Sequence, residues 1–255
     1  NGRAFDVPLL ENRFSLARLG LPIQDLPHLD LLLPARHLWR PRLTSCALSS
    51  LEREILGVRR DQRDIPGFLI PHIYFDYVRT RDAREISRVF YHNAQDILSL
   101  VTLASQICSL VQAPGLGLTA EALDLLSLGR LYERMGLFVE TEQAYRHALR
   151  HPSNLEIKAT ICYHLSFLYK RTGRWEQAIE LWRAMKDSGW GGVLPYVELA
   201  KYYEHRSGDH QHALALTYQA REIAAQKSCS TLRERELNEL NHRISRLERK
   251  LARRR

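Results

Sequence analysis

The sequence predicts a chain of two parts, of which the first mixes helices with short apolar segments and the second is almost entirely helical. Before residue 113, helical patterns alternate with short apolar runs such as residues 29–33, and proline interrupts them often. After residue 117, nearly every segment follows a helical period. A Pro/Gly stretch at residues 113–117 separates these two regions of different sequence pattern. A length of 255 residues suits one domain followed by an array of repeats.

Composition indicates a globular protein of a reducing compartment. With 45% hydrophobic and 26% charged residues, the chain is not disordered, collagenous or coiled-coil throughout. The four cysteines stand far apart with no C-x-x-C pair, which disfavours a disulfide framework or a zinc site. No apolar run approaches the ~20 residues of a membrane helix, and the opening residues lack a signal-peptide pattern. We therefore expect a soluble, cytoplasmic protein without a membrane partner.

The net charge of +8 is concentrated at the carboxyl end of the chain. Residues 231–255 carry nine Lys or Arg against four Glu, which accounts for five of the eight positive charges. The first 112 residues are nearly balanced and contain no lysine. A basic last segment is compatible with a polyanionic partner, but it is also what a solvated helix face looks like.

Three segments of the second half resemble one another. They align when Leu128, Leu165 and Leu199 are superposed, at offsets of 37 and 34 residues. Each segment has a tyrosine four residues after its leucine and a glycine close to the same later position, where a basic turn indicates the end of a helix. These features resemble the tetratricopeptide family over about residues 118–226. The resemblance implies a helical solenoid whose concave face binds a protein or peptide, and its aromatic residues are expected to pack in the core.

A last helix is expected after the repeats. Its apolar residues recur every three or four positions, which predicts an amphipathic helix that covers the final repeat: Leu237, Leu240, Ile244, Leu247 and Leu251. The predicted organisation is thus a first domain at residues 1–112, three repeats at 118–228 and a basic capping helix at 229–255.

The stretch FYHNAQDILSLVTLASQI, residues 90–107, has a continuous helical pattern. Because His92 and Asp96 are four residues apart, their side chains lie one above the other on this helix, and Tyr91 does not share that face. A carboxylate and an imidazole so placed can hold a divalent metal or accept the proton of a bound water. The same spacing also forms ordinary surface pairs.

The opening NGRAFD places Asp6 two residues before Pro8. Asp6 is therefore either the N-cap of a helix or a carboxylate of a site. Taken with the later YHNAQD, the motif resembles the YprB-type, ribonuclease-H-like branch of the DEDD exonuclease superfamily. The segments HLDLLLPARHLW, SCALSSLEREILGV and IPGFLIPHIYFDYVRT look similar to the same branch, so the resemblance spans about residues 1–112 with its motifs in order.

The resemblance implies an α/β ribonuclease-H-like domain with four carboxylates around two Mg or Mn ions. Asp6 and Asp96 match the third and fourth carboxylates, and both are the expected metal ligands. The first pair, an Asp and a Glu on a first strand, has no counterpart, so the domain is expected to be incomplete at its amino end. His92 is the candidate that orients the attacking water, although the family's spacing leaves Tyr91 open for this role.

PARHLWRPR, residues 34–42, combines cations with aromatic rings. Such a mixture suits phosphate contacts and base stacking, but it also describes a basic turn beside a buried tryptophan. The predicted nucleic-acid contacts are Asn1, Arg36, Trp39, Arg40 and Arg42.

These observations predict a metal-dependent nuclease, by analogy a 3′-to-5′ exonuclease, joined to a partner-binding solenoid. The main alternative is a non-catalytic interaction protein whose nuclease fold has degenerated. A nucleic-acid tether formed by the basic last helix is a third reading.

Overall fold

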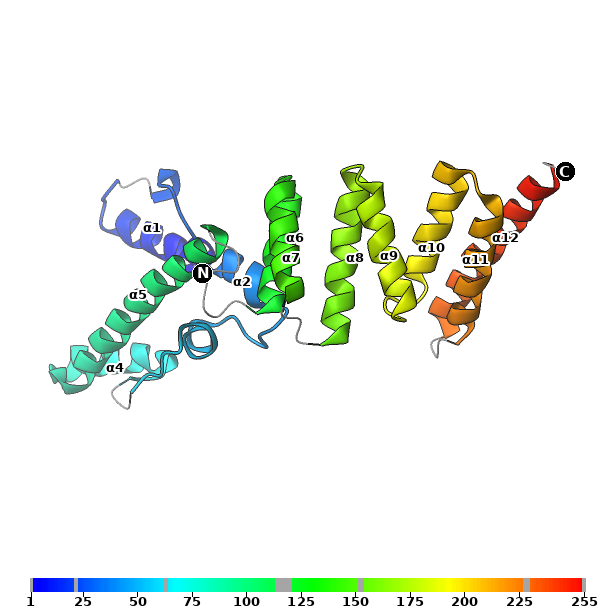
Figure 1. Ribbon diagram of the computed structural model, residues 1–255. Coiled ribbons are helices and arrows are strands. Elements are labelled where there is room, and N and C mark those ends of the chain that lie inside the picture. The colour runs from blue at the N-terminus through cyan, green and yellow to red at the C-terminus, as the bar shows by residue number, and fades with distance from the viewer. Residues whose placement is uncertain are drawn as a thin grey trace. The chain divides into compact units, whose positions relative to one another are not determined.

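The computed structural model describes residues 2–20, 23–61, 64–112, 121–150, 154–226 and 230–253. These residues form two compact units, Asn1–Met135 and Gly136–Arg255. The predicted boundary at 113–117 lies outside the described residues. The division between the units falls later, inside the first predicted repeat, and each unit is described by itself below (Figure 1).

The first unit is built from helices of unequal length. Its long elements are α1 (Val7–Leu16), α2 (Leu32–Trp39), α4 (Ile70–Thr80), α5 (Ala83–Gln112) and α6 (Ala122–Met135). Its short elements are η1 (Gly2–Asp6), η2 (Ile23–Asp25), α3 (Leu48–Leu51), η3 (Glu52–Leu56) and η4 (Gly67–Leu69).

The predicted α/β class of this unit is wrong, because the described residues contain helices and no strand. The apolar run at 29–33 shows why. A short apolar run fits a buried strand and a buried helix equally well. In this chain Leu32 and Leu33 begin α2, and the buried residues Ala35, Leu38 and Trp39 continue the run at helical spacing.

Helix α6 completes the packing of the first unit, and α2 packs against it. Arg42, just after α2, donates two hydrogen bonds to the buried carboxylate of Asp124, from Nε at 3.0 Å and from Nη2 at 2.8 Å. The Tyr132 hydroxyl donates to the carbonyl of Val111 at 2.6 Å. All three hydrogen bonds therefore join α6 to segments that precede residue 113.

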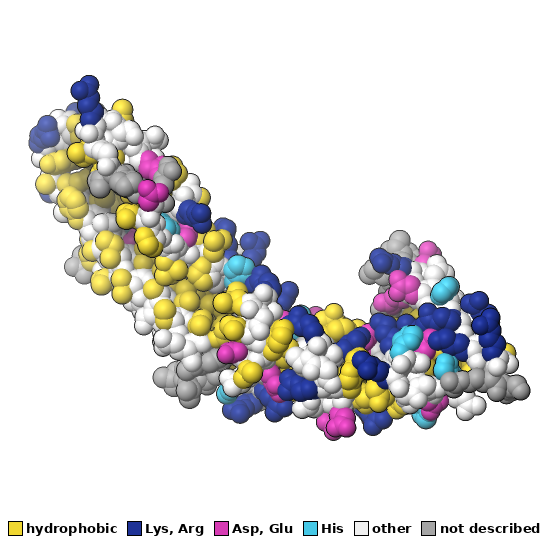
Figure 2. Space-filling view, turned by 90° about the horizontal axis from the view of Figure 1, so that it is seen from above, with side chains coloured by type: hydrophobic (Ala, Val, Ile, Leu, Met, Phe, Trp, Pro, Cys, Tyr) yellow, Lys and Arg dark blue, Asp and Glu magenta, His cyan; other side chains and the backbone are white. Residues whose placement is uncertain are grey.

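Helix α5 leaves much apolar surface uncovered. Phe90, Ile97 and Val101 are 69%, 53% and 64% exposed, and Figure 2 shows hydrophobic side chains gathered over the first unit. By length and composition alone, α5 is also apolar enough to cross a membrane. The expected absence of a membrane partner therefore stays a prediction.

The second unit is a row of helices, consistent with the predicted solenoid. They are α7 (Phe138–Arg150), α8 (Leu155–Arg171), α9 (Trp175–Asp187), α10 (Leu194–Tyr202), η5 (Tyr203–Ser207), α11 (His210–Ala225) and α12 (Ser230–Ala252). In Figure 1, α8 to α11 stand side by side. Gly173 and Gly208 end helical segments at φ values of 76° and 72°, a left-handed conformation that glycine adopts without a steric cost.

Small residues let these helices approach closely. Ala178, Ala213 and Ala220 are completely buried at helix contacts. Helix α12 packs on α11 and buries Leu240 and Leu247 of its apolar stripe. The stripe thus covers the last helical pair, and Arg243, Arg246 and Lys250 of the same helix pair with the buried Glu204 of η5.

Candidate active site

The candidate site lies on α5, which presents His92 and Asp96 from consecutive turns. His92 Nε2 lies 3.5 Å from Asp96 Oδ2, and the two side chains are 15% and 34% exposed. Both groups are therefore partly covered by protein and still open to solvent. The predicted pairing of these two residues is present in the structure.

Arg60 occupies the centre of the site. Its Nε donates to Glu52 Oε2 at 2.8 Å and its Nη2 to Glu52 Oε1 at 2.6 Å, which makes a two-point ion pair with a side chain that is 2% exposed. Nη2 also donates to Asp96 Oδ1 at 2.5 Å. Gly57 ends η3 at φ 67° and turns the chain so that Arg60 comes back over Glu52. The guanidinium thus links η3 to α5.

Asp64 fixes the orientation of the His92 ring. His92 Nδ1 lies 2.7 Å from Asp64 Oδ1, and because an ionised carboxylate can only accept, Nδ1 carries the hydrogen in this contact. Arg60 Nη1 lies 3.1 Å from the same nitrogen, but in this tautomer the two groups are both donors. The Nε2 lone pair is then directed to the side of Asp96. A carboxylate behind one imidazole nitrogen makes the other nitrogen available as a base.

The charges of the site explain two shifted pKa values. Burial disfavours ionised Asp64, but the hydrogen bond from His92 and the charge of Arg60 outweigh it and hold the pKa of Asp64 below its usual value. The hydrogen bonds to Glu52, opposed by burial and helped by Asp96, raise the pKa of Arg60 above its usual value. Three carboxylates surround one guanidinium, so the cluster carries two excess negative charges when His92 is neutral.

Asp6 is exposed at the end of η1 and makes no side-chain capping hydrogen bond to α1. It lines a cavity of about 360 Å³ together with His28, Asp30 and Leu100. Leu100 follows Asp96 by one helical turn on α5, so this cavity reaches α5 next to the candidate site. The structure does not bring Asp6 into the hydrogen-bonded network of Arg60.

The described residues do not fit a two-metal centre by themselves. Hard cations need several oxygen ligands each. Among the residues with described positions, no group of three or more His, Cys, Asp or Glu side chains is placed to hold an ion. Asp96, the expected ligand, instead bonds to Arg60. What the arrangement can do on its own is to hold an imidazole base and to position a partly exposed carboxylate.

The residues predicted to contact nucleic acid are dispersed. The Trp39 side chain is 3% exposed, so its ring is not presented for base stacking. Arg42 is engaged by Asp124 and Glu121. Arg36 and Arg40 are exposed, and Asn1 lies outside the described residues. The nucleic-acid role of this group stays a prediction.

Glu52, Arg60 and Asp64 were missed from the sequence. They come from a segment, LEREILGVRRDQRDIPG, with no apolar period that would place it against α5. Its only signal is an unusual density of charge between two apolar helical patterns. Pairing at separations of 36 and 28 residues, as in Arg60 with Asp96 and Asp64 with His92, leaves no trace in local spacing.

Residues 1–108 match the family model described as RNase_H superfamily. The chain is also similar to the uncharacterized protein YprB of Bacillus subtilis (strain 168), with 33% identity over 263 residues that cover 99% of this chain. It spans 60% of the length of that relative. The match of residues 1–108 contains Asp6, Arg60, Asp64, His92 and Asp96, so the whole candidate site lies within it.

Proposed function

We propose that this protein is a nuclease of the ribonuclease H superfamily and that His92 and Asp96 take part in phosphodiester hydrolysis. The observation that carries the proposal is the Asp64–His92 hydrogen bond beside Asp96, within the segment that matches the family. A nuclease needs a base near the scissile phosphate to take the proton of the attacking water. An imidazole whose Nδ1 is held by a carboxylate and whose ring is partly open to solvent can serve as this base.

Each residue has a defined part in this proposal. His92 accepts the proton of the attacking water at Nε2, and Asp64 positions the imidazole ring through Nδ1. Asp96 positions the attacking water or a cation bound to the phosphate. Asp6, exposed at the end of η1, is a second carboxylate nearby, because it lines the cavity that reaches Leu100, one turn after Asp96 on α5. The predicted Mg or Mn ions and the exonuclease polarity stay predictions, because the described residues do not gather a metal site.

The test is cleavage of a labelled single-stranded oligonucleotide with Mn²⁺ supplied, with EDTA as the blank. We expect His92→Gln and Asp96→Asn each to slow cleavage by about 10²-fold or more, which is the range of acid–base contributions. Helix α4 offers matched controls, since His72 and Asp76 have the same spacing and pair at 3.1 Å on an exposed face. His72→Gln and Asp76→Asn should cleave at the rate of the unmodified protein.

One observation favours the alternative of a non-catalytic interaction protein. Arg60 already pairs with both Asp96 and Glu52, as a cation in a structural ion-pair network would. In that case the protein binds its partners through the second unit, and the first unit serves as a scaffold. Equal cleavage by Asp96→Asn and by the unmodified protein would remove Asp96 from the mechanism. No cleavage above the EDTA blank would support the non-catalytic alternative and rule out the nuclease.

A further inference from the structure

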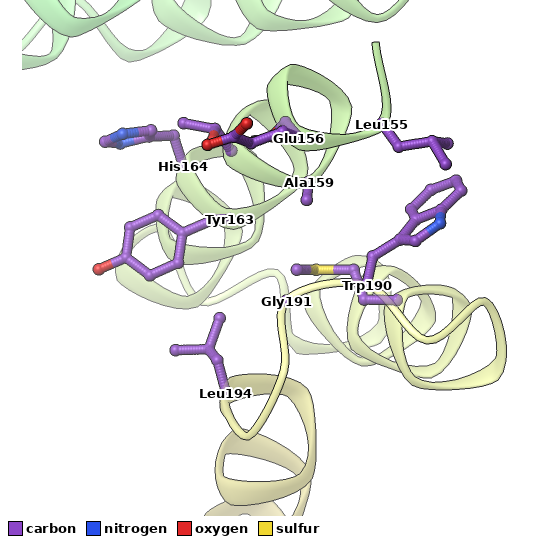
Figure 3. A pocket seen from close by; sticks show the side chains of 10 residues that line it. Leu155, Glu156, Ala159, Tyr163, His164, Trp190, Gly191 and Leu194 are labelled. Carbon is purple, nitrogen blue, oxygen red and sulfur yellow. The ribbon is translucent and has the colours of Figure 1, made fainter. Parts of the chain in front are cut away.

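The second unit has a groove whose first part is an apolar cavity of about 680 Å³. Tyr163 and His164 of α8 line it on one side, and Leu194 of α10 and the adjacent Trp190 close the other. Figure 3 shows Leu194 opposite Tyr163, with Trp190 next to Leu155 at the far end. The cavity therefore lies along the amino-terminal half of α8 and at the amino end of α10.

Cations follow this cavity along the same helices. On α8, Tyr163, Phe167 and Lys170 succeed one another at spacings of four and three, so they share one face. Lys170 Nζ reaches Glu198 Oε2 of α10 at 2.5 Å, and Lys201 Nζ reaches Glu198 Oε1 at 2.6 Å. Glu198 stands four residues after Leu194, which lines the cavity. The groove thus changes from apolar to basic towards the carboxyl ends of α8 and α10.

A second carboxylate gathers three more cations. Glu204 has a completely buried side chain, and its two oxygens accept from Arg243 at 2.8 Å, from Arg246 at 3.0 and 2.8 Å and from Lys250 at 2.8 Å. Burial lowers the pKa of Arg243, with repulsion from Arg246 acting in the same direction and Glu204 and Glu198 opposing both. Glu198 and Glu204 lie six residues apart on the continuous segment of α10 and η5, so the two clusters are within about two helical turns of each other.

The combined patch carries an excess of positive charge. It consists of five cations and two buried carboxylates, a net charge of +3: Lys170, Lys201, Arg243, Arg246 and Lys250 with Glu198 and Glu204. Each carboxylate orders two or three cations and neutralises the charge of only one. Figure 2 shows Lys and Arg side chains gathered over the second unit. An anion that docks here meets charges whose side chains are already ordered.

We propose that a single-stranded nucleic acid binds along this groove, with its phosphates on the basic patch and a base against Tyr163. Charge complementarity supports this occupant, since a row of ordered cations suits a chain of phosphates. The partly exposed ring of Tyr163 lies 4.7 Å from Phe167, and Lys170 lies 5.4 Å from the Phe167 ring. Aromatic rings beside cations are the usual platform for unpaired bases. The biological sense of this binding rests on the proposed nuclease function, for which the groove would hold the substrate strand.

The test measures binding by fluorescence anisotropy with a labelled oligothymidylate of about 20 nucleotides in EDTA, so that cleavage plays no part. Lys201→Gln/Lys250→Gln removes the two most exposed cations and leaves each carboxylate with a partner. We expect binding to be at least ~5-fold weaker. The slope of log K against log[salt] should become shallower by ~1.4, which is the value for two lost phosphate contacts. Tyr163→Ala should weaken binding about 10-fold without changing the salt dependence.

Two controls separate recognition from total charge and from misfolding. Arg221→Gln/Arg235→Gln removes two charges from other positions on α11 and α12 and should bind within about twofold of the unmodified protein. Lys201→Arg/Lys250→Arg keeps the charges and should restore binding. Equal weakening by both glutamine pairs, or displacement of the strand by a Glu-rich peptide that binds more tightly, would overturn the proposal. The binding measurement in EDTA does not depend on cleavage. If the protein binds the strand in EDTA but shows no cleavage in the Mn²⁺ assay, only the proposed nuclease function is refuted.

Discussion

Arg60 links the stability of the first unit to the geometry of its candidate site. We expect Arg60→Met to lower the free energy of unfolding by about 3–5 kcal/mol, because Glu52 is buried and would lose its two-point partner. Urea unfolding at neutral pH measures this loss. Adding Glu52→Leu to the variant should recover most of the stability, since no unpaired charge then remains buried. A double variant as unstable as Arg60→Met alone would show that the pair is not the cause.

Glu204 should make the stability of the second unit depend on pH. Burial opposes its ionisation, but hydrogen bonds from Arg246 and Lys250 lower its pKa to about 2 from the usual 4.5. A carboxylate with a lowered pKa stabilises the fold above its unfolded-state pKa and loses this contribution as the pH falls towards the folded value. We expect Glu204→Gln to cost ~2 kcal/mol at pH 7 and much less near pH 2.

Urea unfolding at a series of pH values checks this expectation. Glu180 of α9 is exposed, so Glu180→Gln is the matched control and should change little at any pH. A cost of Glu204→Gln that stays constant from pH 7 to about 2 would assign the effect to packing rather than to charge.

At the scale of elements, the end of η3 decides whether Arg60 reaches its partners. Gly57 adopts φ 67° with no atom within 4 Å of an added Cβ, so Gly57→Ala introduces backbone strain and no clash. We expect a loss of ~1 kcal/mol of stability. Gly20 also has open space around it but no positive φ, so Gly20→Ala should be neutral or slightly stabilising. Equal effects of the two substitutions would contradict the assigned role of Gly57.

The same elements show how far sequence reasoning could reach. The helix that carries His92 and Asp96 was predicted because its period continues without interruption over many turns. The run at 29–33 was too short to distinguish a strand from a helix, and packing against α6 decided for the helix. The network of Arg60 and Asp64 depends on a turn at Gly57 and on contacts between distant residues, neither of which has a local pattern. The pairing of His92 and Asp96 on α5 could therefore be predicted from the sequence, whereas their contacts with Arg60 and Asp64 could not.

At the scale of the whole molecule, the chain divides after α6 rather than at the Pro/Gly stretch, and this has a consequence for fragments. A fragment of residues 1–135 keeps the contacts of Tyr132 with Val111 and of Asp124 with Arg42. A fragment of residues 1–112 loses both and uncovers the face of α2 that packs on α6. We expect the longer fragment to unfold cooperatively in urea and the shorter one to unfold with a lower midpoint and a broader transition.

Trypsin digestion gives an independent measurement of the same difference, since exposed Arg36 and Arg40 lie on or next to α2. In the longer fragment α6 holds α2 in place, so cleavage at these arginines should require unfolding of the unit. In the shorter fragment local opening of α2 suffices, and cleavage should be faster. If both fragments resist trypsin equally and share one urea midpoint, α6 contributes nothing to the first unit and the domain ends before residue 113, as its composition alone suggests.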